Sequence, residues 1–148
     1  MIKKLVCLYF LMAGSLAQAH EAFGCPYPST IRYVDGFFLP SDMRFQWRSS
    51  KFKSIDLVDR FVDRFIGAIF IPEKDQEREN GLLDKCVYST LKGRRIELRP
   101  VRTGAVEEIS LTGTLHWKIA KDPLEQEVYV CTDNQPDNCS FTIAKPRL

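Results

Sequence analysis

The sequence has little of what common catalytic and cofactor-binding sites require. Histidine occurs only twice in 148 residues, as His20 and His116. No G-x-S-x-G or C-x-x-C motif is present, and no glycine-rich phosphate loop or dinucleotide fingerprint appears. We therefore expect no cofactor, and any catalytic site would have to be assembled in space from residues far apart in the chain.

Long apolar segments are also missing. The run from Leu5 to Ala13 is about half of the roughly 20 residues that a membrane-spanning helix needs. It follows the basic pair Lys3-Lys4 and precedes Ala17-Gln18-Ala19, and this order is typical of a secretory signal peptide. We therefore predict a signal peptide over residues 1–19, a single domain over residues 20–148, and no membrane span after cleavage.

A strong charge of either sign is absent as well. The chain has 21 basic and 19 acidic side chains, and loss of Lys3 and Lys4 with the signal peptide leaves 19 of each. Non-specific binding to nucleic acid depends on the neutralisation of many phosphates by lysine and arginine. We therefore exclude nucleic acid as a partner class.

Cysteine, in contrast, is well represented. Cys7 lies within the predicted signal peptide, so Cys25, Cys86, Cys131 and Cys139 remain, and an even number in an exported chain predicts two disulfides. Three connectivities exist. We favour Cys25–Cys86 with Cys131–Cys139, because the loop from 131 to 139 closes easily between adjacent strands. The chain-entropy model gives roughly 2.6 kcal/mol for the short loop and roughly 4.3 kcal/mol for the long one.

The stretch between Cys131 and Cys139 has two other interpretations. Its aspartate and asparagine side chains offer oxygen atoms to a calcium ion, but their spacing differs from the known calcium-loop pattern. A redox pair is disfavoured because the spacing is C-x₇-C and no helix is expected to lower a thiol pKa. We therefore predict a structural clamp and no metal site. The oxygen-bearing residues are Asp133, Asn134, Asp137 and Asn138.

One segment has the hydrophobic period of a helix. From Ser54 to Ile66 the apolar residues recur every three to four positions, and the tetrad Val-Asp-Arg-Phe occurs at 58–61 and again at 62–65. Ser54 is a suitable N-cap, and Gly67 follows the last turn. We therefore predict an amphipathic helix over about 54–66 whose phenylalanine side packs against a sheet.

Most other segments alternate apolar and polar residues as strands do. Thr30–Val34 and Phe37–Leu39 flank Asp35-Gly36, which is typical of a tight hairpin turn. In Arg94–Val101 the apolar residues point to one face and Arg95, Glu97 and Arg99 to the other. Residues 73–80, EKDQEREN, are charged except at Gln76 and Asn80 and are predicted to form a solvated loop. Further strands are expected at 44–48, 68–71, 86–90, 109–115, 116–119, 127–131 and 139–143. These patterns predict an α+β fold with one helix on an antiparallel sheet of about six to eight short strands, stapled by disulfides.

Several short motifs resemble a known family. The resemblance covers most of the chain after residue 19 and involves Cys25-Pro26, Trp47-Arg48-Ser49, Phe65–Phe70, Gly81–Tyr88 and Cys131–Phe141. These residues are similar to those of DUF3757, a family of small exported bacterial proteins of unknown function. The resemblance implies a bacterial, periplasmic or secreted protein. It implies no catalytic residues.

A small hydrolase is the alternative function. Its site would have to draw on His116, Glu107, Glu108 or Asp84. Glu107 and Glu108 are neighbours, so in a strand they point to opposite sides and do not form a glycosidase pair by themselves. His116 next to Trp117 is more typical of a half-buried sheet residue.

The sequence favours a non-enzymatic binding or interaction module whose partner is an unknown protein or glycan. Phe37 and Phe38 in the hairpin, and Arg95 and Arg99 on one face of a strand, are the candidate partner surface. The arginine face would suit an acidic partner or an anionic glycan. The competing interpretation is an ordinary solvated face with Glu97 between the two arginines. A secreted effector that acts on a host would use the same export signal.

Overall fold

The computed structural model describes residues 21–41, 45–53, 56–101 and 108–143. The predicted signal peptide over residues 1–19 lies outside them. The described residues form β-strands joined by loops and three short 3₁₀ turns. The strands are β1 (Ala22–Phe23), β2 (Ile31–Val34), β3 (Phe37–Pro40), β4 (Trp47–Ser49), β5 (Val62–Ile71), β6 (Leu82–Thr90), β7 (Arg95–Pro100), β8 (Ile109–Leu111), β9 (Trp117–Lys121), β10 (Glu127–Thr132) and β11 (Phe141–Ile143). The 3₁₀ turns are η1 (Pro28–Thr30), η2 (Leu57–Arg60) and η3 (Pro136–Cys139).

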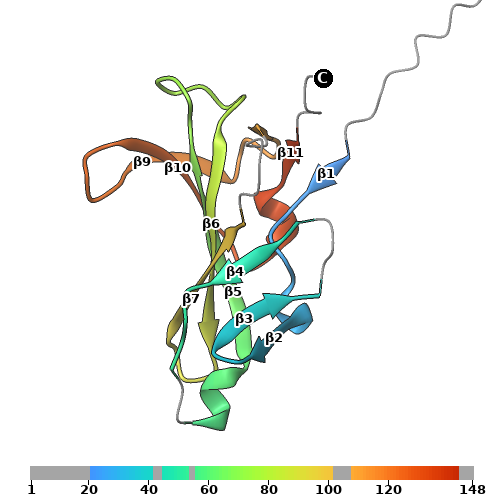
Figure 1. Ribbon diagram of the computed structural model, residues 1–148. Coiled ribbons are helices and arrows are strands. Elements are labelled where there is room, and N and C mark those ends of the chain that lie inside the picture. The colour runs from blue at the N-terminus through green and yellow to red at the C-terminus, as the bar shows by residue number, and fades with distance from the viewer. Residues whose placement is uncertain (1–20, 42–44, 54–55, 102–107, 144–148) are drawn as a thin grey trace, which may run out of the picture.

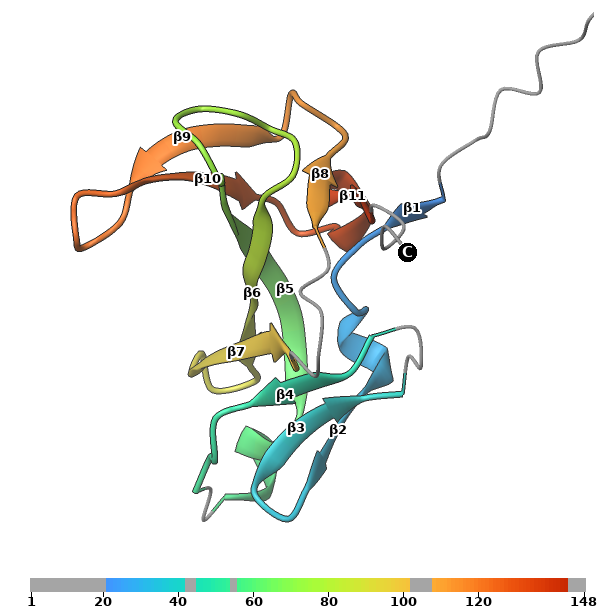
Figure 2. The ribbon, with the colours of Figure 1, turned by 45° about the horizontal axis from the view of Figure 1, so that its top comes forward.

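The described strands form three antiparallel sheets. The largest has six strands in the order β4-β7-β6-β5-β10-β9, the second has the order β1-β11-β8, and the third is the β2–β3 hairpin. Figure 1 shows β5 and β6 side by side along the length of the molecule, with η2 at the lower end and the loop between β5 and β6 at the upper end. Figure 2 shows the β9–β10 hairpin extending away from this pair, and the β2–β3 hairpin beside β4.

The predicted α+β class is wrong, because the segment predicted as a helix over 54–66 is not helical where the structure describes it. The first Val-Asp-Arg-Phe tetrad lies in η2 and the residue after it, while the second opens β5. The proposed N-cap Ser54 lies outside the described residues. Asp56 instead caps η2, with its carboxylate accepting a hydrogen bond from the Val58 backbone N–H over 3.0 Å.

β-bulges explain why this strand resembles a helix in sequence. β5 pairs with β6 but shifts register at three points, one of them between Phe65 and Gly67. A bulge inserts an extra residue, so the next inward-facing position comes three residues later instead of two. Phe65 and Ala68 are accordingly both buried. Val58 and Phe61, which belong to the same predicted apolar side of the helix, are 41% and 62% exposed, so only part of that side reaches the core.

Gly67 allows two strands to approach closely. It pairs with Thr132 of β10, and a Cβ atom at this position would lie 2.2 Å from the Cys131 carbonyl oxygen. Any other residue would therefore push β10 away from β5. The sequence interpretation treated Gly67 as the end of a helix, whereas the structure places it in the middle of a strand.

The predicted hairpin at Asp35-Gly36 is confirmed. Both residues have positive φ angles, 50° and 90°, as a two-residue hairpin turn of the primed type requires. β2 and β3 pair on either side of the turn. The Phe52 backbone N–H donates to the Gly36 carbonyl oxygen over 2.6 Å, and this contact ties the turn to the segment after β4.

One hydrophobic cluster runs through all three sheets and includes both disulfides. Its largest fully buried side chains are aromatic, and each contributes on the order of 1.5–3 kcal/mol by burial. Cys86, Cys131 and Cys139 are completely buried and Cys25 is nearly so. The core therefore joins the β1-containing sheet to the six-stranded sheet. The fully buried aromatic residues are Phe38, Phe65, Phe70, Tyr88, Trp117 and Phe141.

The charged segment 73–80 is a loop, as predicted, and it is tied to its surroundings. The Arg78 guanidinium lies 4.5 Å from the centre of the Tyr129 ring, and the Tyr129 hydroxyl donates to the Gln76 carbonyl oxygen over 2.5 Å. The Arg78 carbonyl oxygen accepts a hydrogen bond from the Leu111 backbone N–H over 2.8 Å. This loop is therefore anchored to β8 and β10.

Candidate functional site

The first disulfide ties the N-terminal segment to the central sheet. Cys25 and Cys86 are bonded, with their Cα atoms 5.9 Å apart, and Cys86 lies in the middle of β6. Two residues on, the Tyr88 hydroxyl donates to the Pro26 carbonyl oxygen over 2.7 Å. Burial raises the pKa of the Tyr88 phenol well above its usual value of 10.0. The segment around Cys25 is thus held by one covalent and one buried polar contact.

The second disulfide closes the loop from β10 to η3. Cys131 and Cys139 are bonded, with their Cα atoms 5.7 Å apart. Cys25–Cys86 and Cys131–Cys139 are therefore bonded in the connectivity that the sequence analysis favoured. Inside the loop, the Asp133 carboxylate accepts a hydrogen bond from the Gln135 backbone N–H over 2.8 Å. The described residues contain no group of three histidine, cysteine, aspartate or glutamate side chains that could hold a metal ion.

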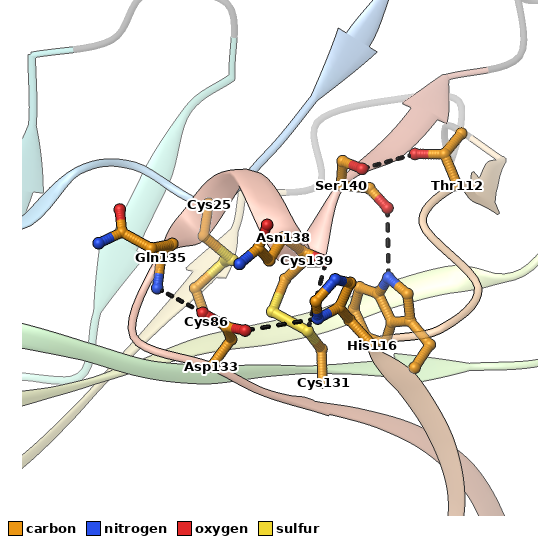
Figure 3. The surroundings of a disulfide bond; sticks show 11 residues. Cys25, Cys86, Thr112, His116, Cys131, Asp133, Gln135, Asn138, Cys139 and Ser140 are labelled. Atoms are coloured by element: carbon orange, nitrogen blue, oxygen red, sulfur yellow. Dashed lines mark hydrogen bonds and ion pairs between the residues drawn. A yellow bond between two sulfur atoms is a disulfide. The ribbon is translucent and has the colours of Figure 1, made fainter.

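His116 lies beside this loop rather than within a strand. It belongs to the turn that leads into β9, and its Nδ1 atom lies 3.4 Å from a carboxylate oxygen of Asp133 (Figure 3). The backbone hydrogen bond from Gln135 is the main cause that lowers the Asp133 pKa, with further contributions from Asn138 and the charge of His116. The Ser140 hydroxyl, in contrast, is paired with Thr112 over 2.8 Å.

The hydrolase candidates are not brought together. Asp84 is on β6 and His116 precedes β9, and β5 and β10 lie between those strands in the sheet. Three strand spacings separate β6 from β9, which is roughly 14 Å. Glu108 is exposed just before β8, and Glu107 lies outside the described residues. Asp84 and His116 therefore do not form a reacting centre.

The outer face of β7 carries a network of charges. The Arg95 Nε atom and the Lys85 Nζ atom each lie 3.0 Å from Glu97, while Arg99 contacts both Glu97 and Asp84. Partial burial is the largest single influence on the Glu97 pKa and raises it. The hydrogen bonds and charges of Lys85 and Arg95 together outweigh it, so the pKa lies below its usual value of 4.5. Arg95, Glu97 and Arg99 do share a face, and the carboxylates offset much of the positive charge.

A pocket of about 210 Å³ lies beside this network. It brings together Phe38 and Arg95, two of the four predicted partner-surface residues. The Arg95 side chain bonds Glu97 through Nε, and among the described residues its two terminal nitrogens have no protein partner. The ammonium of Lys51, also at the pocket, has no carboxylate partner in the described part of the chain. The lining residues are Phe38, Ser49, Ser50, Lys51, Phe52, Arg95, Ile96 and Glu97.

Phe37 and Phe38 do not form one surface. Successive side chains of a strand point to opposite faces, and Phe38 is completely buried, with its ring 5.2 Å from that of Tyr33 and 5.4 Å from that of Phe52. Phe38 is therefore part of the core and cannot contact a partner as an exposed residue. Phe37 is partly exposed, and the Arg48 guanidinium lies 5.6 Å from its ring centre.

The apolar floor of the pocket is held firmly. The Arg94 guanidinium lies 4.1 Å from the centre of the Phe52 ring, and the Tyr33 hydroxyl donates to the Phe52 carbonyl oxygen over 2.8 Å. The Ser49 hydroxyl accepts from the Phe38 backbone N–H and donates to the Ser50 carbonyl oxygen, each over 2.8 Å. The polar groups at the floor are satisfied, so the cations at the rim are the groups available to a ligand.

A second pocket, of about 310 Å³, was missed by sequence reasoning. It lies between the segment around Cys25 and η3, and at its edge the Tyr27 hydroxyl donates to the Asp137 carboxylate. That hydrogen bond raises the pKa of Tyr27 above 10.0. The two residues are 110 positions apart, so no local pattern signals their contact.

The described residues contain no helix with the length and apolarity needed to cross a bilayer. Among protein families, the family described as "Protein of unknown function (DUF3757)" matches residues 18–142. No curated protein and no solved structure matches the chain. This match confirms the family that the sequence resembles.

Proposed function

The chain belongs to the DUF3757 family, whose function is unknown, and from its geometry we propose that it is an exported, non-enzymatic binding module for an acidic group on a partner. The observation that carries this proposal is the pocket beside β7, which Lys51 and Arg95 line together with apolar residues, and no described carboxylate pairs with Lys51 or with the terminal nitrogens of Arg95. Export follows from the signal-peptide pattern at residues 1–19 and agrees with two bonded cysteine pairs, which persist in oxidising compartments. The proposed location is the periplasm or the medium.

The size and charge of the pocket favour a small anionic group. A volume of about 210 Å³ is below the usual range for drug-sized ligands and suits one acidic sugar or one acidic side chain. Arginine binds carboxylates and sulfates through two nitrogens at once, and the two terminal nitrogens of Arg95, which contact no described residue, have that geometry. Glu97 would repel a second negative charge on the same side, so the pocket selects one acidic group and not a polyanion. We take an anionic glycan as the leading candidate.

A glycan array with uronic-acid and neutral oligosaccharides tests this proposal. We expect binding to acidic glycans, a loss of roughly tenfold or more with Arg95→Gln or Lys51→Gln, and no change with Lys118→Gln, an exposed cation on β9. The matched control separates the pocket from general positive charge. Equal binding by the wild type and the Lys51→Gln/Arg95→Gln double variant would contradict the proposal. Acidic peptides tested in the same way identify a protein partner.

Export is tested separately. Peptide mapping of the protein from the exported fraction, without reduction, should give His20 as the first residue and the pairs Cys25–Cys86 and Cys131–Cys139. A first residue at Met1 in that fraction would contradict signal cleavage. A free thiol at any of the four cysteines would contradict the two-disulfide structure.

A further inference from the structure

Large apolar side chains face solvent at one end of the β5–β6 pair. Leu57 is 67% exposed and Leu91 is 56% exposed. Val58, which is 41% exposed, and Phe61, which is 62% exposed, belong to the same end of the pair. Single exposed apolar residues are normal on a protein surface, but a contiguous group marks a contact site. We call Leu57, Val58, Phe61 and Leu91 the apolar tip.

The apolar tip is one surface because η2 is bonded to the turn after β6. The Leu91 backbone N–H donates to the Phe61 carbonyl oxygen over 3.3 Å. The Asp59 carboxylate below them is buried and accepts hydrogen bonds from Thr90 over 3.1 Å and Arg94 over 3.2 Å. These contacts fix the backbone of η2 to the turn after β6, at the lower end of the β5–β6 pair (Figure 1).

Basic residues outnumber acidic ones in the segments that carry the apolar tip, and the opposite end of the molecule is acidic. The tip segments carry five basic and three acidic side chains, and the ion pairs Asp56–Lys92 and Asp59–Arg94 leave three basic and one acidic side chain outside them. The loop over residues 73–80, at the far end of the β5–β6 pair, has four acidic and two basic side chains. The charged residues in the segments around the apolar tip are Lys53, Asp56, Asp59, Arg60, Asp63, Arg64, Lys92 and Arg94.

We propose that the apolar tip inserts into the headgroup region of a bilayer that contains anionic lipids. Exposed apolar side chains with an excess of lysine and arginine in the same segments are typical of interfacial membrane contacts. The tip projects from a terminal turn, so a fluid lipid surface can cover it without a matching cleft. A second copy of the chain would bring two surfaces of net positive charge together and is disfavoured by repulsion.

The pocket beside β7 lies at the same end of the molecule as the apolar tip, because Arg94 bonds Asp59 of η2 and also lies over the Phe52 ring at the pocket floor. The acidic loop points away from the membrane, because the β5–β6 pair runs between the two ends. Ten residues of β5 extend roughly 33 Å. The inference does not depend on the proposed glycan site, because the variants that test it, Leu57→Ser and Phe61→Ser, change no residue that lines the pocket.

Vesicle co-sedimentation tests the proposal, with phosphatidylglycerol–phosphatidylethanolamine vesicles compared with phosphatidylcholine vesicles. We expect binding to the anionic vesicles that weakens with added salt. Leu57→Ser and Phe61→Ser should each weaken it roughly tenfold. The matched controls are Leu115→Ser and Leu124→Ser, at positions 87% and 78% exposed in turns away from the tip. All variants share one N-terminus, so any lipid affinity of residues 1–19 is common to them.

Three results would overturn the proposal. One is the absence of binding to anionic vesicles at low salt. Another is an equal loss of binding in the Leu115→Ser control, which would mean that any exposed leucine contributes. The third is a lipid-free dimer, seen by analytical ultracentrifugation, that Phe61→Ser converts to monomer, because the tip would then be a contact between two copies. A thermal melt followed by circular dichroism checks that each serine variant is folded.

Discussion

The Thr90 hydroxyl donates a hydrogen bond to the buried carboxylate of Asp59, and this contact joins the last residue of β6 to η2. Arg94 donates to the other carboxylate oxygen, and its own ring contact with Phe52 reaches the pocket beside β7. One carboxylate therefore positions both the apolar tip and the pocket floor. This makes Asp59 the polar residue whose loss should disturb the lower end of the molecule most.

Asp59→Ala should lower the free energy of unfolding by about 2 kcal/mol, because it leaves the Thr90 hydroxyl and the Arg94 guanidinium without their acceptor. Asp63→Ala is the matched control, since Asp63 is exposed on β5, and should change stability by less than about 0.5 kcal/mol. Urea denaturation measures both. A similar small effect for the two variants would show that the Asp59 contacts contribute no stability.

The Cys131–Cys139 bond should behave as one unit under mutation. Cys131→Ser and the Cys131→Ser/Cys139→Ser double variant lose the same bond, so both should lose about 2.6 kcal/mol of unfolding free energy, as expected for so short a loop. Equilibrium unfolding of the two variants provides the comparison. A single variant far milder than the double one would argue against this pairing.

Gly67→Ala should destabilise the protein by about 2–3 kcal/mol or more, because the new Cβ atom would collide with the Cys131 carbonyl oxygen. Gly93→Ala serves as the control. Its Cβ atom would meet nothing within 4 Å, and only the positive φ angle of 81° opposes it, at a cost of about 1 kcal/mol. The melting temperature should therefore fall more in Gly67→Ala than in Gly93→Ala. The opposite result would exclude a close approach of β5 and β10 at Gly67.

Glu97 should contribute to the acid sensitivity of the fold. Its pKa in the folded protein is lowered, so the unfolded chain binds the proton more tightly and the contribution to stability is present above the usual pKa of 4.5. That contribution is lost as the pH falls through the lower, folded-state pKa. The difference in unfolding free energy between the wild type and Glu97→Gln should therefore shrink between neutral pH and about pH 3. A difference that is constant over this range would contradict the pKa shift.

Local chemistry allowed part of the fold to be predicted. The Asp35-Gly36 turn was recognisable because few other dipeptides adopt two positive φ angles. The outward face of β7 followed from strict alternation, since that strand pairs with β6 without a register shift. The short cysteine loop was recognisable because few geometries close it. Each of these features depends on residues that are near one another in the chain.

The rest depended on contacts between distant segments. The predicted helix failed because bulges in β5 reproduced a helical spacing, and only pairing with β6 shows that the segment is extended. The partner-surface prediction joined Phe37 to Phe38 although a strand sends them to opposite faces. The pocket beside β7 combines residues from two segments more than forty positions apart, and the contact of Tyr27 with Asp137 spans 110 positions.

The order of strands in space also has a consequence for biosynthesis. β10 lies between β5 and β9, and β11 lies between β1 and β8, so two of the three sheets are completed by residues 127–143. A ribosome delivers the chain from its N-terminus, so β5 and β6 are synthesised while one edge of β5 still lacks its neighbour β10. Nascent chains stalled before residue 127 would present that edge to other molecules. Residues 127–143 complete these two sheets, so the growing chain needs protection from aggregation until they have been synthesised.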